Sequence, residues 1–223
     1  MQLSVIIPVY NEVDTIEETL ARVKAASVDK EVIVVDDCST DGSREFLLRV
    51  PDIQLILHER NVGKGAAIRT ALEHVTGDIV IIQDADLEYD PQDFPAMIQP
   101  IVDGKADVVY GSRFLRGRPT MRLPNFVANK ILALAAGILF GTRITDEATC
   151  YKAFRTRLIK SIPLTCKRFE FCPEVTAKLR RRGVKIAEVP IRYTARSSAE
   201  GKKITWWDGV VALWTLIKYR FVG

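Results

Sequence analysis

Short runs rich in β-branched residues alternate with helical patterns through the first half of the chain, and this alternation limits the fold more than any other feature. Such a pattern is typical of βαβ units around a mostly parallel sheet flanked by helices. We therefore expect an α/β, Rossmann-like fold. The predicted strands and intervening helices are Leu3–Ile7, Asp14–Ala26, Glu31–Val35, Asp41–Val50, Ile53–Leu57, Gly65–His74, Asp78–Ile82, Gln92–Val102 and Val108–Tyr110.

Polar clusters follow four of these strands. They are Tyr10-Asn11-Glu12, Asp36-Asp37, Asn61 to Gly65 and Asp84–Asp86. Ligands of open α/β sheets bind at the carboxyl ends of the strands, where loops from several strands converge. We therefore predict one composite site rather than four separate ones.

Asp84 and Asp86 follow the apolar run Ile79–Ile82, so two carboxylates emerge where a buried strand reaches solvent. If the segment stays extended, side chains two residues apart face the same side and can address one cation. Mg²⁺ is commonly bound by one or two carboxylates together with substrate phosphates. An Asp-x-Asp pair is also common in loops that bind no metal, so the spacing alone leaves both alternatives open.

Several other functions are excluded by missing motifs. The stretch from Asn61 to Ala67 lacks the first glycine and the Lys-Ser/Thr ending of an ATPase phosphate loop, and its glycines are expected to permit a tight turn into a helix. No Gly-x-Gly-x-x-Gly follows the first strand and no Gly-x-Ser-x-Gly is present. The four cysteines are scattered without a Cys-x-x-Cys pair, which argues against zinc and disulfides.

The second half contains two apolar segments with alternative explanations. Ile131–Phe140 is shorter than the roughly twenty residues that span a bilayer, so a buried or interfacial helix is expected. The predicted helix from Trp206 to Val222 mixes aromatic, aliphatic and basic residues, which suits either a membrane surface or packing on the protein's own core. We accordingly expect a large domain over residues 1–205 and an amphipathic C-terminal helix over 206–223.

Charge is distributed unevenly along the chain. Residues 1–151 carry a net charge of −8 and residues 152–223 a net charge of +12. The basic third favours an anionic partner such as a phosphate-bearing substrate or acidic lipid, or it is simply a solvated face. No recognised nucleic-acid-binding module accompanies it, so nucleic acid is ranked last. The chain starts without the basic region of a signal peptide, which predicts a cytoplasmic location.

Taken in order and spacing, the motifs resemble the family 2 inverting glycosyltransferases. The quoted stretches are Pro8-Val9-Tyr10-Asn11-Glu12, Val34 to Gly42, Asn61-Val62-Gly63-Lys64-Gly65, Asp84-Ala85-Asp86-Leu87 and Gly111-Ser112-Arg113. Within that family the chain is most similar to polyprenyl-phosphate sugar synthases, the dolichol-phosphate mannosyltransferase type. This resemblance implies a GT-A fold, a nucleotide-sugar donor, a lipid-phosphate acceptor, Mg²⁺ or Mn²⁺, and contact with the cytoplasmic face of a membrane.

The resemblance also implies roles for individual residues. The residues expected to contact the nucleotide are Pro8, Tyr10, Glu12, Asp36 and Asp37, and Lys64 is expected in the turn beside it. Asp84 and Asp86 are expected to bind the metal, the ribose and the diphosphate. Glu88 is expected to be a further metal ligand, at a position where many relatives have Gln. Arg113 and Arg122 are expected to bind the acceptor phosphate. Arg196, Lys202 and Lys203 are expected to form a basic segment that closes over the diphosphate.

Asp146 begins a stretch in which Cys150-Tyr151-Lys152 replaces the Ser-Gly-Phe of many relatives, so the sugar and the acceptor stay open. We assign Asp146 to acceptor positioning, because a phosphate nucleophile is already ionised near neutral pH. It becomes the general-base candidate if the acceptor is a hydroxyl of a saccharide. Besides that alternative, a non-catalytic nucleotide-sugar-binding scaffold is a rival, and the paired acids together with Arg113 argue against it.

Overall fold

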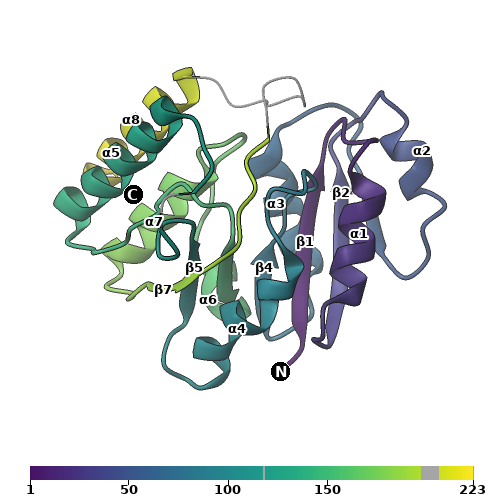
Figure 1. Ribbon diagram of the computed structural model, residues 1–223, viewed down its shortest axis with the longest axis horizontal. Coiled ribbons are helices and arrows are strands. Elements are labelled where there is room, and N and C mark those ends of the chain that lie inside the picture. Colours follow the sequence, from purple (N-terminus) through teal and green to yellow (C-terminus); the bar gives the residue numbers. More distant parts are fainter. Residues whose placement is uncertain (118, 197–205, 223) are drawn as a thin grey trace.

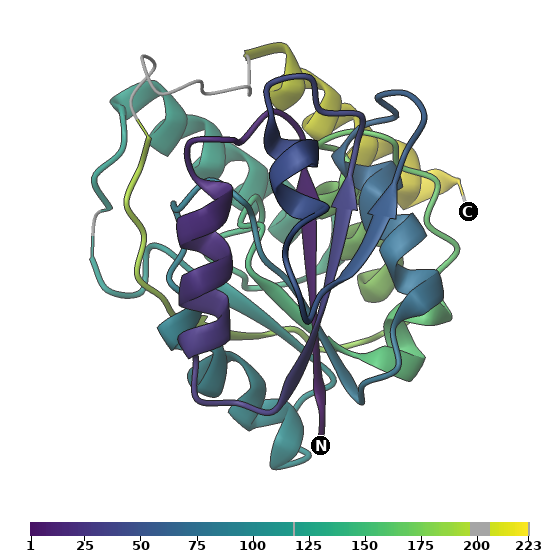
Figure 2. The ribbon, with the colours of Figure 1, turned by 90° about the vertical axis from the view of Figure 1, so that its right-hand side faces the viewer.

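The computed structural model describes residues 1–117, 119–196 and 206–222, and it contains a seven-stranded mixed sheet with helices on both faces (Figures 1 and 2). Lys202 and Lys203 lie outside the described residues. The elements are β1 (Leu3–Val9), α1 (Ile16–Ala25), β2 (Lys30–Asp36), α2 (Ser43–Leu47), β3 (Gln54–Leu57), α3 (Lys64–His74), β4 (Ile79–Ile82), a 3₁₀ turn (Pro91–Asp93), α4 (Phe94–Val102), β5 (Val108–Ser112), α5 (Leu123–Phe140), β6 (Lys152–Arg155), α6 (Thr156–Lys160), α7 (Phe171–Arg181), β7 (Ala187–Pro190) and α8 (Trp206–Phe221).

The strands run in the order β3-β2-β1-β4-β6-β5-β7. β1 pairs in parallel with both β2 and β4, with Leu3 opposite Lys30 on one side and Ile79 on the other, and β3 extends this parallel part. β6 is inserted antiparallel between β4 and β5. The carboxyl ends of β1 to β4 therefore lie at one edge of the sheet, where the sequence predicted a composite site.

Two cores form because successive side chains of a strand point to opposite faces of the sheet. Val5 and Ile7 pack in one cluster with α1 and α4, whereas Ile6 packs in the other cluster with α3, α5, α7 and α8. Figure 2 shows α1 in purple and α3 in blue on opposite faces of the sheet. β1, β4 and most of β2 are buried on both faces, which explains their apolar runs, whereas the edge strand β3 is partly exposed.

The predicted strands and helices of the first half are confirmed, with ends shifted by a few residues. Strands β6 and β7 and helices α6 and α7 were not predicted. β6 was hidden by its charged ends, Lys152 and Arg155. Lys152 is nevertheless fully buried, because its ammonium donates hydrogen bonds to the carbonyls of Glu147 and Thr149, each at 2.7 Å.

Helix α5 is longer than predicted, because it begins at Leu123 and not at Ile131. Its 18 residues have a mean hydropathy of 1.6 and are long and apolar enough to cross a membrane by length and composition alone. Only 17% of the helix is buried inside the protein, so it is not a typical core helix. Leu134 and Ile138 are the most exposed of its large apolar side chains, at 64% and 75%.

Helix α8 lies beside α5 and against α7 (Figure 1). Its Ala212, Leu216 and Tyr219 belong to the same core as α3 and α7. Its other side exposes Trp206 and Trp214, at 79% and 64%. The helix thus combines core packing on one side with an exposed aromatic side, and the division of the chain at residue 206 stays a prediction.

Candidate functional site

A cavity of about 590 Å³ opens at the carboxyl ends of β1, β2 and β4 and extends beneath α5, α7 and α8. Ten of the residues predicted from the sequence line it. They are Pro8, Tyr10, Glu12, Asp37, Lys64, Asp84, Asp86, Glu88, Arg113 and Arg196. The polar clusters after separate strands therefore meet in one site, as the strand-end argument predicted.

Asp37 holds the turn that begins α3. Its carboxylate accepts hydrogen bonds from the amides of Val62 at 2.9 Å and Gly63 at 2.7 Å, and it pairs with His58 Nδ1 at 2.7 Å. Gly63 has a φ of +99°, and a Cβ there would lie 2.3 Å from the Lys167 carbonyl oxygen. The glycine is therefore required, which confirms the predicted tight turn into a helix.

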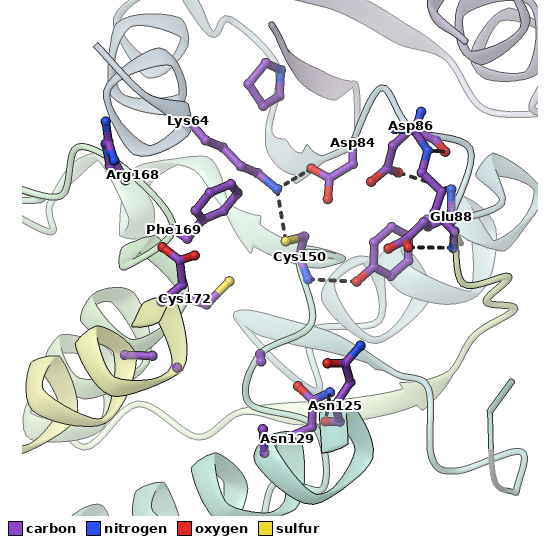
Figure 3. Close-up of a pocket in the computed structure, with 18 of the residues that line it drawn as sticks. Lys64, Asp84, Asp86, Glu88, Asn125, Asn129, Cys150, Arg168, Phe169 and Cys172 are labelled. Atoms are coloured by element: carbon purple, nitrogen blue, oxygen red, sulfur yellow. Dashed lines mark hydrogen bonds and ion pairs between the residues drawn. The ribbon is translucent and has the colours of Figure 1, made fainter. Parts of the chain in front are cut away.

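Lys64, the first residue of α3, joins two parts of the cavity (Figure 3). Its ammonium donates one hydrogen bond to the Asp84 carboxylate and another to Cys150 Sγ at 3.0 Å. Burial alone lowers the pKa of Lys64, but the adjacent Asp84 carboxylate raises it well above its ordinary value. The ammonium therefore stays charged and neutralises one of the acids.

Asp86 lies in a turn and not in an extended segment. The prediction that Asp84 and Asp86 face the same side assumed an extended segment, and that assumption does not hold. The chain turns at Ala85 and Asp86, and Leu87 has a φ of +60°. The turn directs the amide of Glu88 onto Asp86 Oδ1 at 3.1 Å. Burial, followed by the charges of Asp84 and Glu88, raises the pKa of Asp86 to about 7.

Glu88 and Arg196 link this turn to the segment after β7. Glu88 accepts hydrogen bonds from the Arg196 amide at 2.8 Å and from the Tyr193 hydroxyl at 3.0 Å. The Arg196 guanidinium donates to the carbonyl oxygen of Asp86 at 2.8 Å and forms an ion pair with Glu12 at 2.7 Å. Arg196 therefore lies beside the acids, while both oxygens of Glu88 accept hydrogen bonds from protein groups, and the predicted contact of Arg196 with the donor diphosphate stays a prediction.

A divalent cation fits Asp84 and Asp86 better than Glu88. Crowded, buried carboxylates disfavour their own ionisation, and a cation relieves that cost. Oxygen ligands of this kind suit Mg²⁺ or Mn²⁺, with substrate phosphates completing the set. Within residues 1–117, 119–196 and 206–222, no three acidic, cysteine or histidine side chains already stand together as metal ligands. Asp84 and Asp86 are thus the two carboxylates of the cavity that could hold a divalent cation together with a substrate diphosphate.

Arg113 is fixed by Asp146 on the opposite wall. Arg113 Nε and Nη2 each donate to the carboxylate at 2.7 Å, and the Arg113 amide donates to it at 3.0 Å. The guanidinium also lies over the Tyr193 ring, 5.0 Å from its centroid. Burial lowers the pKa of Arg113, but Tyr89 and Asp146 raise it well above its ordinary value. The wall thus presents a fixed positive charge to the cavity.

The structure does not place every predicted residue on the cavity wall. Asp36 is fully buried and forms an ion pair with Arg44 at 2.6 Å, so it supports the strand end and does not face a nucleotide. Asp146 is also fully buried, behind Arg113. Arg122 is the exposed residue at which α5 begins and does not line the cavity.

Several residues that line the cavity were not predicted as site residues. They include Asn125 and Asn129 of α5, Glu147, Cys150, Arg168, Cys172 of α7 and Tyr193. The two asparagines are four residues apart on a helix whose other residues are apolar except for Lys130, and this spacing predicts one polar helix face. Glu147 and Cys172 carried no such signal, because only the arrangement of α5, α7 and β6 brings them to the cavity.

Comparison with known proteins identifies the family. Residues 4–162, more than half of the chain, match the family described as Glycosyl transferase family 2. The chain belongs to this family. It is therefore a glycosyltransferase, and the resemblance drawn from its motifs is confirmed.

Curated relatives of this family 2 glycosyltransferase act on polyprenyl phosphates according to their names. Undecaprenyl-phosphate mannosyltransferase of Micrococcus luteus is 28% identical over 246 residues, which cover 99% of each chain. Undecaprenyl-phosphate 4-deoxy-4-formamido-L-arabinose transferase of Edwardsiella ictaluri is 31% identical over 90% of this chain and 62% of its own length. Dolichol-phosphate mannosyltransferase of Pyrococcus furiosus is 26% identical over 100% of this chain and 68% of its own.

Solved structures show the same fold. Glucosyl-3-phosphoglycerate synthase from Mycobacterium tuberculosis, in complex with Mn²⁺, UDP and its product, has a TM-score of 0.76 at 20% identity and covers 100% of this chain and 81% of its own. Mannosyl-3-phosphoglycerate synthase from Rubrobacter xylanophilus has a TM-score of 0.77 at 18% identity over 98% of this chain and 72% of its own. At these identities the likeness concerns the fold, and the predicted GT-A architecture is confirmed.

Proposed function

We propose that this glycosyltransferase moves a sugar from a nucleoside-diphosphate sugar to a polyprenyl phosphate, with inversion at the sugar carbon and with Mg²⁺ or Mn²⁺ bound by Asp84 and Asp86. One observation carries the proposal. A single cavity joins the polar ends of the parallel strands to two helices that expose large apolar side chains. The names of the relatives that cover nearly the whole chain support transfer of a sugar to a polyprenyl phosphate.

The nucleotide occupies the strand end in this proposal. Pro8, Tyr10 and Asp37 line that end of the cavity, and Asp37 orders the turn at Gly63 through hydrogen bonds. The diphosphate lies at Asp84, where Lys64 supplies a positive charge. A bound divalent ion would neutralise the negative charge that develops on the departing diphosphate.

Arg113 and Asp146 favour an acceptor that is already ionised. A hydroxyl acceptor needs a general base that can reach its proton. Asp146, the predicted base for that case, is fully buried, and both of its oxygens are engaged by Arg113. A phosphate acceptor needs no base, and the fixed guanidinium of Arg113 suits its negative charge. In this role Asp146 positions Arg113, and the resemblance assigns Arg122 to the lipid phosphate and Lys202 and Lys203 to the diphosphate.

The lipid chain and the membrane lie on the α5 and α8 side. The exposed apolar side chains there include Leu134, Ile138, Trp206 and Trp214. A helix with an apolar face and basic neighbours binds at a membrane surface with that face in the lipid boundary. We propose contact with the cytoplasmic face of a membrane, assisted by the net positive charge of residues 152–223.

The deciding experiment incubates the purified protein with radiolabelled UDP- or GDP-sugars, Mn²⁺ or Mg²⁺, and undecaprenyl phosphate in detergent. The expected product is extracted into organic solvent and releases its sugar in mild acid. A parallel reaction offers saccharide acceptors in water. Transfer to the saccharides only would overturn the lipid-phosphate proposal, and nucleotide-sugar binding without any transfer would support the non-catalytic scaffold instead.

A further inference from the structure

Glu147 is a buried carboxyl group that faces the cavity without a partner. It is fully buried, it lines the cavity, and neither of its carboxylate oxygens has a hydrogen-bond partner among the described residues. Arg180 Nε is the one other buried side-chain polar atom in that condition within the described part of the chain. Buried polar groups in native proteins are nearly always paired, so this exception requires an explanation.

The neighbouring groups do not satisfy the Glu147 side chain. The ammonium of Lys152 is committed to the backbone carbonyls of Glu147 and Thr149, and it lies over the Tyr110 ring at 3.7 Å from the centroid. The Thr176 hydroxyl shares a hydrogen bond with the Tyr110 hydroxyl at 2.8 Å, and it also lowers the pKa of the adjacent Glu147 carboxyl, so it is a weak neighbour of that carboxyl and not a partner with ordinary hydrogen-bond geometry. Both oxygens of Glu147 are buried at the cavity wall and keep hydrogen-bonding capacity that the described residues do not use, so a small shift of this wall would bring them to a ligand.

The position of Glu147 separates it from the nucleotide. The Lys64 ammonium donates hydrogen bonds to both Asp84 and Cys150 and so links them across the cavity. In Figure 3, Cys172 lies on the other side of Cys150 from Asp84. Cys172 is close enough to Glu147 to act on its charge. In a nucleoside-diphosphate sugar, the sugar follows the diphosphate. A diphosphate at Asp84 whose sugar extends past Cys150 would bring that sugar to the part of the cavity that Cys172 and Glu147 line.

The chemistry of Glu147 decides what it can bind there. A carboxylate repels a phosphate, so the acceptor phosphate belongs at Arg113 and not at this wall. Sugar hydroxyls, by contrast, donate hydrogen bonds to a carboxylate and accept one from a carboxylic acid. Burial raises the pKa of Glu147 to about 7, so both forms are available near neutral pH.

We propose that the Glu147 carboxyl binds hydroxyl groups of the sugar that is transferred, and thereby selects which sugar the enzyme accepts. This proposal rests on the function proposed above. A site built to hydrogen-bond a substrate hydroxyl discriminates strongly against a sugar that lacks it, because the buried carboxyl is then left unpaired. In the absence of substrate the buried Glu147 carboxyl lacks hydrogen bonds, which destabilises the protein, and the correct sugar supplies them.

The test combines enzyme variants with altered sugars. Binding and kcat/KM are measured for the wild type, Glu147→Gln and Glu147→Leu, using the nucleoside diphosphate, the preferred nucleotide sugar and its singly deoxygenated analogues. We expect the wild type to lose about 10- to 100-fold for one deoxy position. Glu147→Leu should lose most of that discrimination and Glu147→Gln should change it, because an amide still forms a hydrogen bond with a hydroxyl but cannot be ionised. The affinity of both variants for the nucleoside diphosphate alone should stay within about twofold of the wild type, because in this proposal Glu147 contacts only the sugar.

Glu174→Gln is the matched control. Glu174 is equally buried on α7, but its carboxylate is paired with Lys178, Thr165 and Cys166, and it does not line the cavity. It should keep the wild-type ranking of deoxy sugars. If Glu147→Leu fails to fold, the nearly isosteric Glu147→Gln still gives the answer.

Three results would overturn the proposal or separate it from the proposed function. Glu147 variants that rank the deoxy sugars as the wild type does would refute the sugar contact. Loss of turnover by more than about a thousandfold with unchanged ranking would assign Glu147 as a general base for a hydroxyl acceptor. If the wild type transfers sugar only to a water-soluble acceptor, yet Glu147 still governs the ranking, the lipid-phosphate proposal fails and the sugar contact stands.

Discussion

The cavity has a strand end, at the carboxyl ends of β1, β2 and β4, and a helix end, formed by α5, α7 and α8. Charged side chains are paired with one another at the strand end. At the helix end a buried carboxyl has no hydrogen-bond partner among the described residues, and large apolar side chains face outward. Lys64 neutralises Asp84, and Arg196 spans Glu12 and the Asp86 turn. Glu147, in contrast, makes no side-chain hydrogen bond among the described residues. The strand end is thus pre-organised before substrate arrives, and the helix end is completed by what binds there.

This difference matches the two parts of the donor, the diphosphate and the sugar, that the two ends of the cavity are proposed to bind. Pre-organised charges stabilise a transition state without reorganisation cost, which suits the leaving diphosphate. Unpaired groups give specificity, because the correct ligand relieves a cost that a wrong ligand leaves in place. We therefore expect substitutions at the strand end to reduce turnover for every sugar, and substitutions at the helix end to change which sugar and which surface are used.

The largest effect is expected for Asp86→Asn. In the proposed mechanism the change weakens metal binding where the diphosphate leaves, and removal of one such electrostatic group typically lowers turnover by about 100- to 1000-fold. Transfer of radiolabelled sugar is measured over a Mn²⁺ titration, with circular dichroism to verify folding. Turnover close to that of the wild type would contradict the metal assignment and the contrast between the two ends.

Arg113→Lys and Asp146→Asn should each lower kcat/KM for the lipid phosphate by about 10- to 100-fold, because either change breaks the two-pronged pair that fixes the positive charge. The double variant should be scarcely worse than the single ones, since both act through one group. If Asp146→Asn proves far more damaging than Arg113→Lys, then Asp146 has a role of its own, such as that of a base.

The strand end was predictable from the sequence and the helix end was not. Asp37, Lys64 and Asp84 follow strands with clear apolar patterns, and the carboxyl ends of parallel strands must meet at one edge. The turn at Leu87 was missed, because a left-handed φ on a leucine is set by tertiary contacts and not by local preference. The strand assignment therefore located the site without giving its detailed geometry.

The helix end depends on long-range packing. β6 contains the buried Lys152, whose charge is compensated by carbonyls that only the folded loop supplies. Glu147 reaches the cavity through that same loop, so its role is invisible before the antiparallel insertion of β6 between β4 and β5 is known. The length of α5 was underestimated because Asn125, Asn129 and Lys130 interrupt its apolar run.

Glu147→Gln should stabilise the protein at alkaline pH. Burial raises the pKa of Glu147 from 4.5 to about 7, so between these values the folded chain holds a proton that the unfolded chain has released. The free energy of unfolding of the wild type therefore falls as pH rises through that window, and above it the variant should gain up to about 3 kcal/mol. Urea unfolding at pH 5 and pH 8 measures the difference, which should nearly vanish at pH 5.

Glu174→Gln should change the free energy of unfolding in the opposite direction in the same experiment. Burial raises the pKa of Glu174, but the ion pair with Lys178 and hydrogen bonds from Thr165 and Cys166 lower it to about 2. Its ionised form therefore stabilises the fold above about pH 4.5, and this contribution is lost as pH falls toward 2. The variant should be less stable than the wild type at both pH 5 and pH 8. Equal behaviour of the two variants would show that the two carboxyls do not differ as described.

The smallest effect is expected for single charges placed on the outer side of the helix end. Ile138→Glu on α5 and Trp214→Glu on α8 replace side chains that are 75% and 64% exposed, so the fold itself should tolerate them. Each change removes apolar area from the proposed lipid contact and adds a negative charge, which should lower binding to anionic vesicles by about 10-fold. Flotation with vesicles of phosphatidylglycerol and phosphatidylcholine measures this binding.

Leu48→Glu is the matched control for these surface substitutions. Leu48 is 62% exposed at the end of α2, away from α5 and α8 (Figure 1). A membrane contact confined to α5 and α8 predicts that Leu48→Glu floats like the wild type, whereas a general loss of apolar surface would weaken all three variants alike. Transfer to a short-chain, water-soluble polyprenyl phosphate should be unchanged in all three, because none of these side chains lines the cavity. Reduced flotation of the α5 and α8 variants alone would therefore separate membrane docking from chemistry at the strand end.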